Sequence, residues 1–317
     1  MTTEKEKETP TRDLLIIGSG PAGLSAALYA ARADLDSAVL TGMTLHGQAS
    51  ITDIIENYPG FPEGIGGAEL GQLFQTQAER FGADVVMDQA TSVDLSHQPF
   101  MVETYGETYR AKAVIISTGA DHRKLDIPGE KELTGKGVSY CGTCDGWFFK
   151  DKDIVVVGGG DSALEEGLFL TRFAKSVTII HRRDELRAGA ILQNRAFANK
   201  KISFLWDTVV TEIIGEDAVD AVRLENVKTG EERVHATEGV FIFIGHTPNS
   251  ELFAGQLDLD DKGYVVVNKF METSRPGVFA AGEVADPDFR QVVTSAGMGA
   301  AAAIQATRYL ENLEEGL

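Results

Sequence analysis

Cysteine is scarce in this chain, which has two cysteines among 317 residues. Two are too few for the disulfide framework that holds small secreted domains together. Long apolar runs are missing as well, since no stretch approaches the ~18 consecutive apolar residues of a membrane-spanning helix. Positive charge is in the minority, with 29 Lys and Arg against 48 Asp and Glu and a net charge of −19. We therefore expect neither a membrane protein nor a nucleic-acid-binding protein, because the latter needs a positive surface.

The remaining composition is that of a globular protein. Hydrophobic residues make up 43% of the chain, which is ample for a core and excludes general disorder. The length suggests about two domains. The start of the chain, residues 1–12, is polar and has no apolar segment of the kind found in secretory signals. We expect it to be a frayed tail that leads into the first strand.

Two segments share one pattern: an apolar strand, a cluster of glycines, and a helix rich in Ala and Leu. They span about 13–33 and 153–173, and each is followed by another short apolar strand, Ser37–Leu40 in one and Ser176–Ile180 in the other. Each segment therefore predicts a βαβ unit with buried parallel strands. Two such units predict an α/β protein with two doubly wound dinucleotide-binding domains.

Other elements are predicted between and after these units. Short apolar strands that end at a glycine are expected at Ala113–Ser117, Val240–Ile244 and Val278–Ala281. An antiparallel strand is expected at Tyr264–Val267, after a turn, and an Ala-rich helix at Ala296–Leu313.

The first glycine cluster has dinucleotide-binding spacing, with Gly18, Gly20 and Gly23 in the pattern G-x-G-x-x-G. The first glycine makes the tight turn, the second lets the backbone approach a pyrophosphate, and the third lets helix and strand pack closely. The helix N-terminus then offers N–H groups to the phosphates. One usual feature is missing: the acidic residue expected after the second strand is replaced here by Thr41 and Gly42.

The second glycine cluster has Gly158, Gly160 and then Ala163, a variant of the same pattern. Its second strand ends in His181-Arg182-Arg183-Asp184-Glu185-Leu186-Arg187. Arginines at this place favour a ribose 2′-phosphate through charge-assisted hydrogen bonds, whereas an acid would favour a free 2′-hydroxyl. The pattern therefore predicts NADPH rather than NADH, and the alternative is a solvated basic patch.

Both cysteines lie in one motif, Cys141-Gly142-Thr143-Cys144, followed by Asp145. This spacing fits a redox disulfide, half of a zinc site, or chance. Zinc needs about four ligands, and the chain has no second cysteine pair and only 6 histidines, so we predict a redox dithiol and no metal site. Asp145 could donate or accept the proton that thiol–disulfide exchange requires; alternatively, it serves only a turn with Gly146.

Taken together, these features resemble the low-molecular-weight thioredoxin reductase family. The resemblance extends over about 13–310, nearly the whole chain. The matching segments are Gly-Ser-Gly-Pro-Ala-Gly at 18–23, Glu-Asn-Tyr-Pro-Gly at 56–60, Cys-Gly-Thr-Cys-Asp-Gly at 141–146, His-Arg-Arg-Asp at 181–184 with Arg187-Ala188, Gly-His-Thr-Pro-Asn at 245–249, and Arg-Gln-x-x-x-Ser-Ala-Gly at 290–297.

The resemblance implies FAD on the first glycine loop and NADPH on the second. It implies a discontinuous FAD-binding domain, 1–121 and 248–317, with an NADPH-binding domain, 122–247, inserted between hinge strands. The implied cofactor-binding positions of the first domain are Gly18, Ser19, Gly20, Pro21, Ala22, Gly23, Thr41, Gly47, Gln48, Asn57, Gly119, Gly282, Glu283, Arg290 and Gln291; those of the second are Gly158, Gly160, Asp161, Ser162, His181, Arg182, Arg183 and Arg187.

The resemblance also implies a mechanism. Electrons pass from NADPH through FAD to the Cys141–Cys144 disulfide and then to thioredoxin, with Cys144 next to the flavin, Cys141 as the attacking sulfur and Asp145 as acid or base. The family is typically a cytoplasmic homodimer and rotates its NADPH domain on the hinge strands. The cysteine motif alone leaves open a reductase of a different protein or small-molecule disulfide. A ferredoxin-fed flavoprotein and a non-catalytic nucleotide-binding module are further alternatives.

Two positions depart from the family pattern. His46 stands where the family usually has glycine before Gly47 and Gln48, and its side chain could crowd the cofactor, hydrogen-bond it, or point outward. We expect it to point outward. Glu283 stands where the family has Asp after Gly282, so its carboxylate is one methylene further from the backbone. Both departures concern flavin affinity rather than the type of chemistry.

Overall fold

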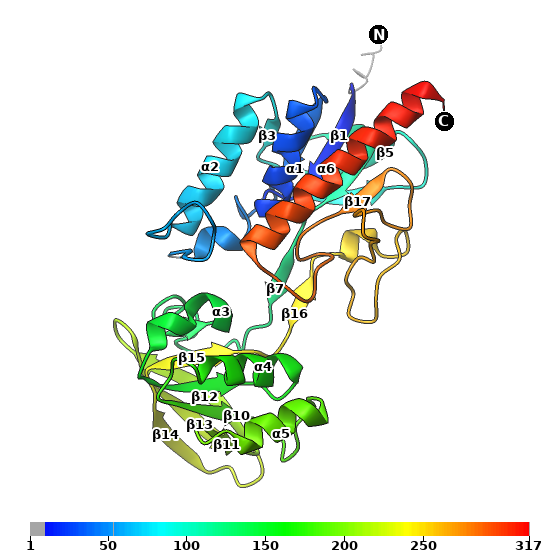
Figure 1. Cartoon of the computed structure of the whole chain (residues 1–317). Helices are drawn as coiled ribbons and strands as arrows, with labels where there is room; N and C mark the ends of the chain where they lie inside the picture. Colours follow the sequence, from blue (N-terminus) through cyan, green and yellow to red (C-terminus); the bar gives the residue numbers. More distant parts are fainter. Residues whose placement is uncertain (1–9, 53, 317) are drawn as a thin grey trace, which may run out of the picture. The chain divides into compact units, whose positions relative to one another are not determined.

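The computed structural model describes residues 10–52 and 54–316, which form two compact units (Figure 1). The first unit combines the stretches on either side of the second, Met1–Asp121 and Thr247–Leu317, and the second unit is His122–His246. Two short strands, β7 (Ala120–His122) and β16 (His246–Pro248), pair with each other where the chain passes between the units.

The first unit is built on a seven-stranded sheet. Its strands are, in spatial order, β3 (Asp84–Val86), β2 (Ser37–Leu40), β1 (Thr11–Ile17), β6 (Thr108–Ile116), β5 (Phe100–Thr104) and β4 (Ala90–Asp94), with β17 (Val278–Ala280) also paired to β6. Strand β6 has room for two partners on one edge, because residues 108–111 pair antiparallel with β5 and residues 114–116 pair parallel with β17.

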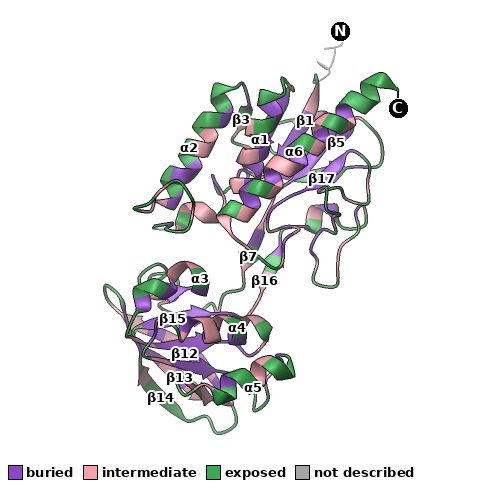
Figure 2. Ribbon diagram, in the orientation of Figure 1, coloured by how far each residue is buried: buried purple, intermediate pink, exposed green. Residues whose placement is uncertain are grey.

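Alternate residues of β1 enter two different cores, as a strand buried on both faces requires. Leu14 and Ile16 pack with the helices α1 (Pro21–Arg32) and α6 (Val292–Glu315), whereas Leu15 and Ile17 pack with β4, β5 and the segment near Phe253. Figure 2 shows the resulting buried strands and the striped helices whose outer faces are exposed. Helix α2 (Gly67–Arg80) and the short 3-10 helices η1 (Gln48–Ile51) and η3 (Glu251–Phe253) complete the unit.

Helices α1 and α6 approach each other closely because small residues line their contact. Ala22, Ala26 and Ala30 of α1 share one core cluster with alanines of α6. At Gly299 the approach is closest, since a Cβ atom there would lie 1.9 Å from the carbonyl oxygen of Ala22. The helix pair therefore depends on a residue without a side chain at this point.

The second unit is built on a five-stranded parallel sheet and a three-stranded antiparallel sheet. The first contains β11 (Ile202–Leu205), β10 (Ser176–Ile180), β9 (Asp153–Val157), β15 (Gly239–Ile242) and β8 (Val138–Ser139), and the second contains β12 (Thr208–Gly215), β13 (Val219–Asn226) and β14 (Glu232–Ala236). The helices of this unit are α3 (Gly142–Asp145), η2 (Gly146–Phe149), α4 (Asp161–Leu170) and α5 (Ala190–Ala198).

The predicted doubly wound class is confirmed. The strands expected at Ser37–Leu40 and Ser176–Ile180 have these bounds. The three glycine-ended strands are present as β6, β15 and β17, which end one or two residues earlier than expected, and β6 begins five residues earlier. In the part of the chain that the structure covers, no helix combines the length and apolar character needed to span a bilayer.

Three local predictions need correction. The segment Tyr264–Val267 is not a strand: Val265 makes one isolated antiparallel bridge with Leu259, because the N–H groups of Val265 and Val266 donate to Val284 and Asp258, on different segments. Helix α6 begins at Val292, four residues earlier than expected. Strand β1 begins at Thr11, within the expected tail; the rest of that tail, residues 1–9, lies outside the described residues.

The α1–α6 contact yields a stability prediction. Gly299→Ala forces a methyl group against the backbone of Ala22, and overpacking of this kind costs about 1–3 kcal/mol. Gly297→Ala is the matched control on the same helix, because a Cβ atom there meets nothing within 4 Å. We expect urea unfolding to show a lower free energy of unfolding for Gly299→Ala and an unchanged or higher one for Gly297→Ala. Equal stabilities would contradict the close approach.

Candidate redox centre and nucleotide loops

The first glycine loop joins β1 to α1, and its three glycines meet different surroundings. Gly18 has φ +110°, and a Cβ atom there would lie 2.3 Å from the carbonyl oxygen of Ser117. A Cβ atom at Gly23 would lie 1.9 Å from the carbonyl oxygen of Gly18. Gly20, by contrast, meets nothing within 4 Å and is the N-cap of α1, whose first residue is Pro21 and whose first turn carries no acid. Two glycines serve packing, and the middle one leaves an open surface at a helix N-terminus.

Buried hydrogen bonds fix the position of this loop. The hydroxyl of Ser19, which is 1% exposed, donates to the carbonyl oxygen of Thr41 at 3.2 Å and accepts from the backbone N–H of His46 at 3.1 Å. Ser19 and the buried Thr41, both predicted cofactor contacts, thus use polar groups to join the loop to the segment after β2.

His46 does not point outward, so that expectation is wrong. Its side chain is only 6% exposed, its Nε2 lies 2.8 Å from Oε1 of Gln75 on α2, and its ring fills the space beside Gly71. The backbone of His46 has φ +64°, a conformation that favours glycine. The ring packs against α2 because that helix offers both a hydrogen-bonding amide and a residue without a side chain.

Other predicted positions of the first unit come together from distant parts of the sequence. Gly47 lies against Gly20, because its added Cβ would be 3.0 Å from the Cα of Gly20. Gly282 lies against the predicted position Ala22, where the corresponding distance to the Cβ of Ala22 is 2.9 Å. The side chain of Asn57 donates to Oε1 of Gln291 at 3.1 Å. These contacts place segments from both halves of the unit around the first loop.

The carboxylates of this region include one with a perturbed pKa. Burial raises the pKa of Glu283 to about 7, with Asp286 and Asp121 adding to the effect and Arg290 opposing it. Asp121 in turn accepts a hydrogen bond of 2.6 Å from Nε2 of Gln48. Gly119, two residues earlier, has φ +71° and accepts from the backbone N–H of Asn249.

The two cysteines form a disulfide in the second unit. Cys141 is the N-cap of α3, and its Sγ accepts a hydrogen bond of 3.2 Å from the backbone N–H of Cys144. A one-turn helix places residues three apart on the same face, which brings the sulfurs within bonding reach. Both cysteines are half-buried, so this disulfide is not sealed in the core.

Asp145 follows the disulfide and is held by one buried serine. The hydroxyl of Ser139 donates to Oδ2 of Asp145 at 2.6 Å and accepts from the backbone N–H of Cys141 at 3.1 Å. Burial raises the pKa of Asp145, and the hydrogen bond from Ser139 lowers it. A carboxyl group with a raised pKa next to a disulfide in the chain is suited to proton transfer.

Three residues near this centre were not predicted from the sequence: Trp147, Phe148 and Ser139. Trp147 and Phe148, directly after the motif, are 57% and 45% exposed. Exposed aromatic side chains next to a reactive group are typical of a contact surface. Ser139 carried a weaker signal, since only its place two residues before Cys141 set it apart from other serines.

The second glycine loop, between β9 and α4, is tied to the strand end that carries the arginines. A Cβ atom at Gly158 would lie 2.4 Å from the carbonyl oxygen of Phe243, whereas Gly160 meets nothing within 4 Å. The backbone N–H of Arg187 donates to the carbonyl oxygen of Gly159 at 2.8 Å. Predicted positions Asp161 and Ser162 begin α4, and Oδ1 of Asp161 accepts from the backbone N–H of Gly189 at 2.8 Å.

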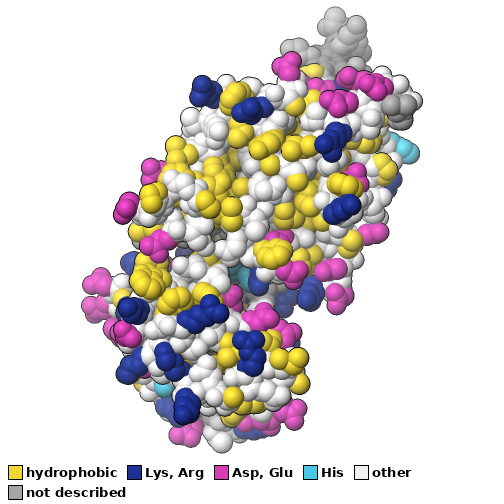
Figure 3. Space-filling model, in the orientation of Figure 1, with side chains coloured by type: hydrophobic (Ala, Val, Ile, Leu, Met, Phe, Trp, Pro, Cys, Tyr) yellow, Lys and Arg dark blue, Asp and Glu magenta, His cyan; other side chains and the backbone are white. Residues whose placement is uncertain are grey.

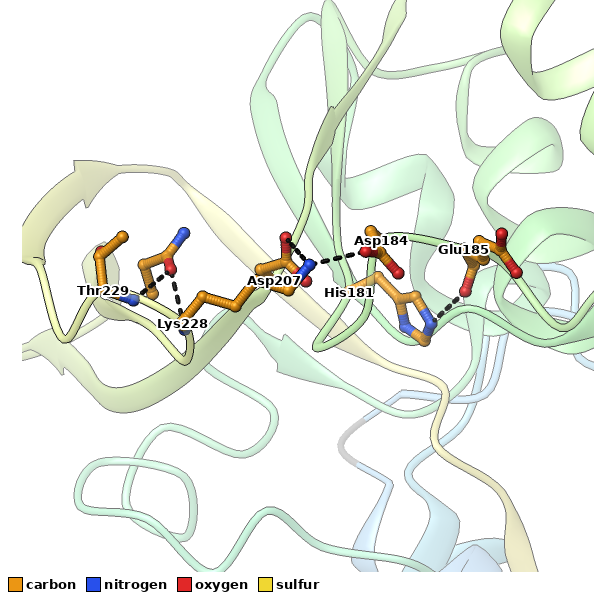
Figure 4. A network of polar contacts seen from close by, with 7 residues as sticks. His181, Asp184, Glu185, Asp207, Lys228 and Thr229 are labelled. Atoms are coloured by element: carbon orange, nitrogen blue, oxygen red, sulfur yellow. Dashed lines mark hydrogen bonds and ion pairs between the residues drawn. The ribbon is translucent and has the colours of Figure 1, made fainter.

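We call residues 181–187 the arginine loop. His181 is buried, its ring lies against Gly159, and its Nε2 is 3.1 Å from the carbonyl oxygen of Glu185 (Figure 4). Burial lowers the pKa of His181. The ring therefore supports the loop from inside, whereas the side chains of Arg182, Arg183 and Arg187 are exposed. On the face drawn in Figure 3, Lys and Arg side chains of the second unit lie interspersed with acids.

Comparison with known proteins agrees with this geometry. The sequence profile of the pyridine nucleotide-disulphide oxidoreductase family matches residues 12–299. A thioredoxin reductase of Streptomyces clavuligerus is 53% identical over 307 residues, covering 96% of this chain and 95% of its own. One of Mycolicibacterium smegmatis is 54% identical over 299 residues, covering 94% and 96%. The crystal structure of a thioredoxin reductase of Streptococcus pyogenes matches with a TM-score of 0.91 at 47% identity, covering 95% and 99%.

The Ser139–Asp145 hydrogen bond yields a pH prediction. Because this bond lowers the pKa of Asp145, Ser139→Ala raises that pKa further. We expect the limb of the pH–rate profile that belongs to Asp145 to move to higher pH when the reduction of a small aromatic disulfide is measured. Ser203→Ala serves as control, because it removes a hydroxyl on β11 of the same unit that hydrogen-bonds the hydroxyl of Thr178 at 3.1 Å. A profile that is the same in Ser139→Ala as in the unsubstituted protein would contradict the role of the serine.

Proposed function

The chain belongs to the pyridine nucleotide-disulphide oxidoreductase family and to the thioredoxin reductases within it, and on this premise we propose that it carries electrons from NADPH through FAD and the Cys141–Cys144 disulfide to thioredoxin. It is an oxidoreductase that uses a flavin and a pyridine nucleotide. The observation that carries the proposal is the half-buried disulfide with Asp145 beside it, in a chain that has two open nucleotide loops.

FAD fits the first glycine loop. Gly20 offers open space at the N-terminus of α1, and no acid in the first turn of that helix opposes a pyrophosphate. The buried contacts of Ser19, Thr41 and Gly47 hold this surface in place. We assign residues 1–121 and 248–317 to this cofactor, with Gln48, Asn57, Arg290 and Gln291 toward its flavin end by family resemblance.

NADPH fits the second glycine loop for an electrostatic reason. Among residues 10–52 and 54–316, none of the ion pairs involves Arg182, Arg183 or Arg187. Exposed guanidinium groups without acidic partners favour a 2′-phosphate through charge-assisted hydrogen bonds. We assign residues 122–247 to NADPH binding.

The cysteine pair supplies the last electron transfer. Bound NADPH and FAD supply hydride and two-electron chemistry, which converts the disulfide into two sulfhydryl groups. The Cys141 thiolate then attacks the partner disulfide and displaces one of its sulfurs as a thiolate. Cys144 breaks the mixed disulfide, so the Cys141–Cys144 bond forms again and the partner leaves as a dithiol. The N–H of Cys144 that points at Sγ of Cys141 stabilises negative charge on that sulfur, and Asp145 passes a proton to the leaving thiolate.

The assembly and location follow the family resemblance. We propose a homodimer that works in the cytoplasm, where thiols are kept reduced. Trp147 and Phe148 support a protein rather than a small molecule as the disulfide substrate, because their exposed rings adjoin the redox motif.

Cys141→Ser tests the proposal most simply. We expect this variant to retain flavin bleaching by NADPH under anaerobic conditions. It should lose thioredoxin-dependent NADPH oxidation, because the Cys141 sulfur that attacks the thioredoxin disulfide is absent. In the unsubstituted protein, NADH should be at least about tenfold poorer than NADPH, since charged hydrogen bonds to a 2′-phosphate are lost. Retained thioredoxin reduction in Cys141→Ser would refute the assignment. If the unsubstituted protein oxidises NADPH with small-molecule disulfides but not with thioredoxin, the alternative of a reductase for a different disulfide is supported instead.

A further inference from the structure

The arginine loop contains acidic side chains, which can compete with a bound phosphate for the guanidinium groups. Asp184 follows Arg183 directly and lies three residues before Arg187, so its carboxylate is close enough in sequence to pair with either guanidinium. A paired guanidinium has fewer donors left for another anion. The loop holds two acids, Asp184 and Glu185, and the structure pairs Asp184 with a cation from outside the loop.

Lys228 is the cation that pairs with Asp184. It lies in the turn between β13 and β14, and its Nζ is 2.6 Å from Oδ2 of Asp184 and 3.1 Å from Oδ2 of Asp207 (Figure 4). Asp207 follows β11 closely and is the less exposed of the two acids. One ammonium group thus binds a carboxylate of the arginine loop on one side and a more buried carboxylate on the other.

Backbone hydrogen bonds hold Lys228 at this place. The N–H of Val227 donates to the carbonyl oxygen of Asp207 at 2.7 Å, and the N–H of Asp207 donates to the carbonyl oxygen of Arg183 at 3.2 Å. Oδ1 of Asn226 accepts from the N–H groups of Lys228 and Thr229, both at 3.0 Å. The turn is therefore fastened to the arginine loop independently of the lysine side chain, and a substitution of that side chain leaves the turn in place.

Stability does not account for the ion pair. Both Lys228 and Asp184 are more than half exposed, and exposed ion pairs contribute little to folding. The ion pair instead affects the local distribution of charge. Among the described residues Asp184 has an ion-pair partner, whereas the three arginines have none. In a chain of net charge −19, an unpaired acid beside a phosphate site would also repel the phosphate.

We propose that Lys228 is a positioning residue that sets specificity for the 2′-phosphorylated nucleotide, because it binds Asp184 and so leaves the arginines of the loop available. This inference rests on the proposed use of NADPH. It assigns no direct contact between Lys228 and the nucleotide. Its effect passes through Asp184, which makes the two residues separable by mutation.

The test compares binding of adenosine 2′,5′-bisphosphate with that of adenosine 5′-monophosphate by calorimetry at low ionic strength. Lys228→Gln should weaken bisphosphate binding ~5-fold, the size expected for one screened charge, and leave monophosphate binding unchanged. Asp184→Asn in the Lys228→Gln background should restore bisphosphate binding, because the released competitor is removed. The effect should shrink in 0.5 M salt, for which the Debye length is about 4 Å.

Lys175→Gln is the matched control. Lys175 pairs with Asp153 at 2.6 Å and is similarly exposed, but it precedes β10, whereas the arginine loop follows that strand. Loss of affinity for both ligands in Lys228→Gln, an equal loss in Lys175→Gln, or no rescue by Asp184→Asn would overturn the inference. If the unsubstituted protein binds both ligands equally well, the proposed NADPH preference fails first. Discrimination in the unsubstituted protein with no change in Lys228→Gln refutes the role of Lys228 alone.

Discussion

Steric exclusion at the strand-to-helix turns organises this molecule. Gly18 and Gly23 in the first unit, and Gly158 in the second, stand where a Cβ atom would overlap a backbone oxygen. Only with these turns closed does each helix pack against its sheet with its N-terminus at the carboxyl end of the first strand. The middle glycines, Gly20 and Gly160, then border open space. Both proposed nucleotide-binding surfaces follow from this one constraint.

The chemistry depends on hydrogen bonds that reach across short loops. Ser139 hydrogen-bonds both Asp145 and the backbone of Cys141, and so positions the proposed proton-transfer group relative to the proposed attacking cysteine. In the arginine loop, the buried His181 contacts the backbone of Glu185, and Lys228 pairs with Asp184 at the surface. In both places the proposed reactive or binding group is held by a neighbouring side chain, which the proposals do not require to touch the substrate.

The sequence predicted the buried parallel strands well, because continuous apolar runs that end at glycines leave few alternatives. It did not predict β4 and β5 or the sheet of β12, β13 and β14, whose alternating polar residues give a weak signal. It failed at His46, because Gly71 and Gln75, the residues that receive the ring, lie on a helix further along the chain. Long-range pairs such as Asn57–Gln291 and Asp184–Lys228 depend on the tertiary fold and could not be inferred from local patterns.

The central claim is that electrons from NADPH arrive at the Cys141–Cys144 disulfide. The most direct test adds NADPH anaerobically to the FAD-loaded protein, traps thiols with iodoacetamide and locates them by peptide mass spectrometry. We expect both cysteines, the only two in the chain, to be alkylated after NADPH and neither to be alkylated without it. Flavin bleaching by NADPH with both cysteines still unalkylated would contradict the account, because the electrons would then leave the flavin by another route.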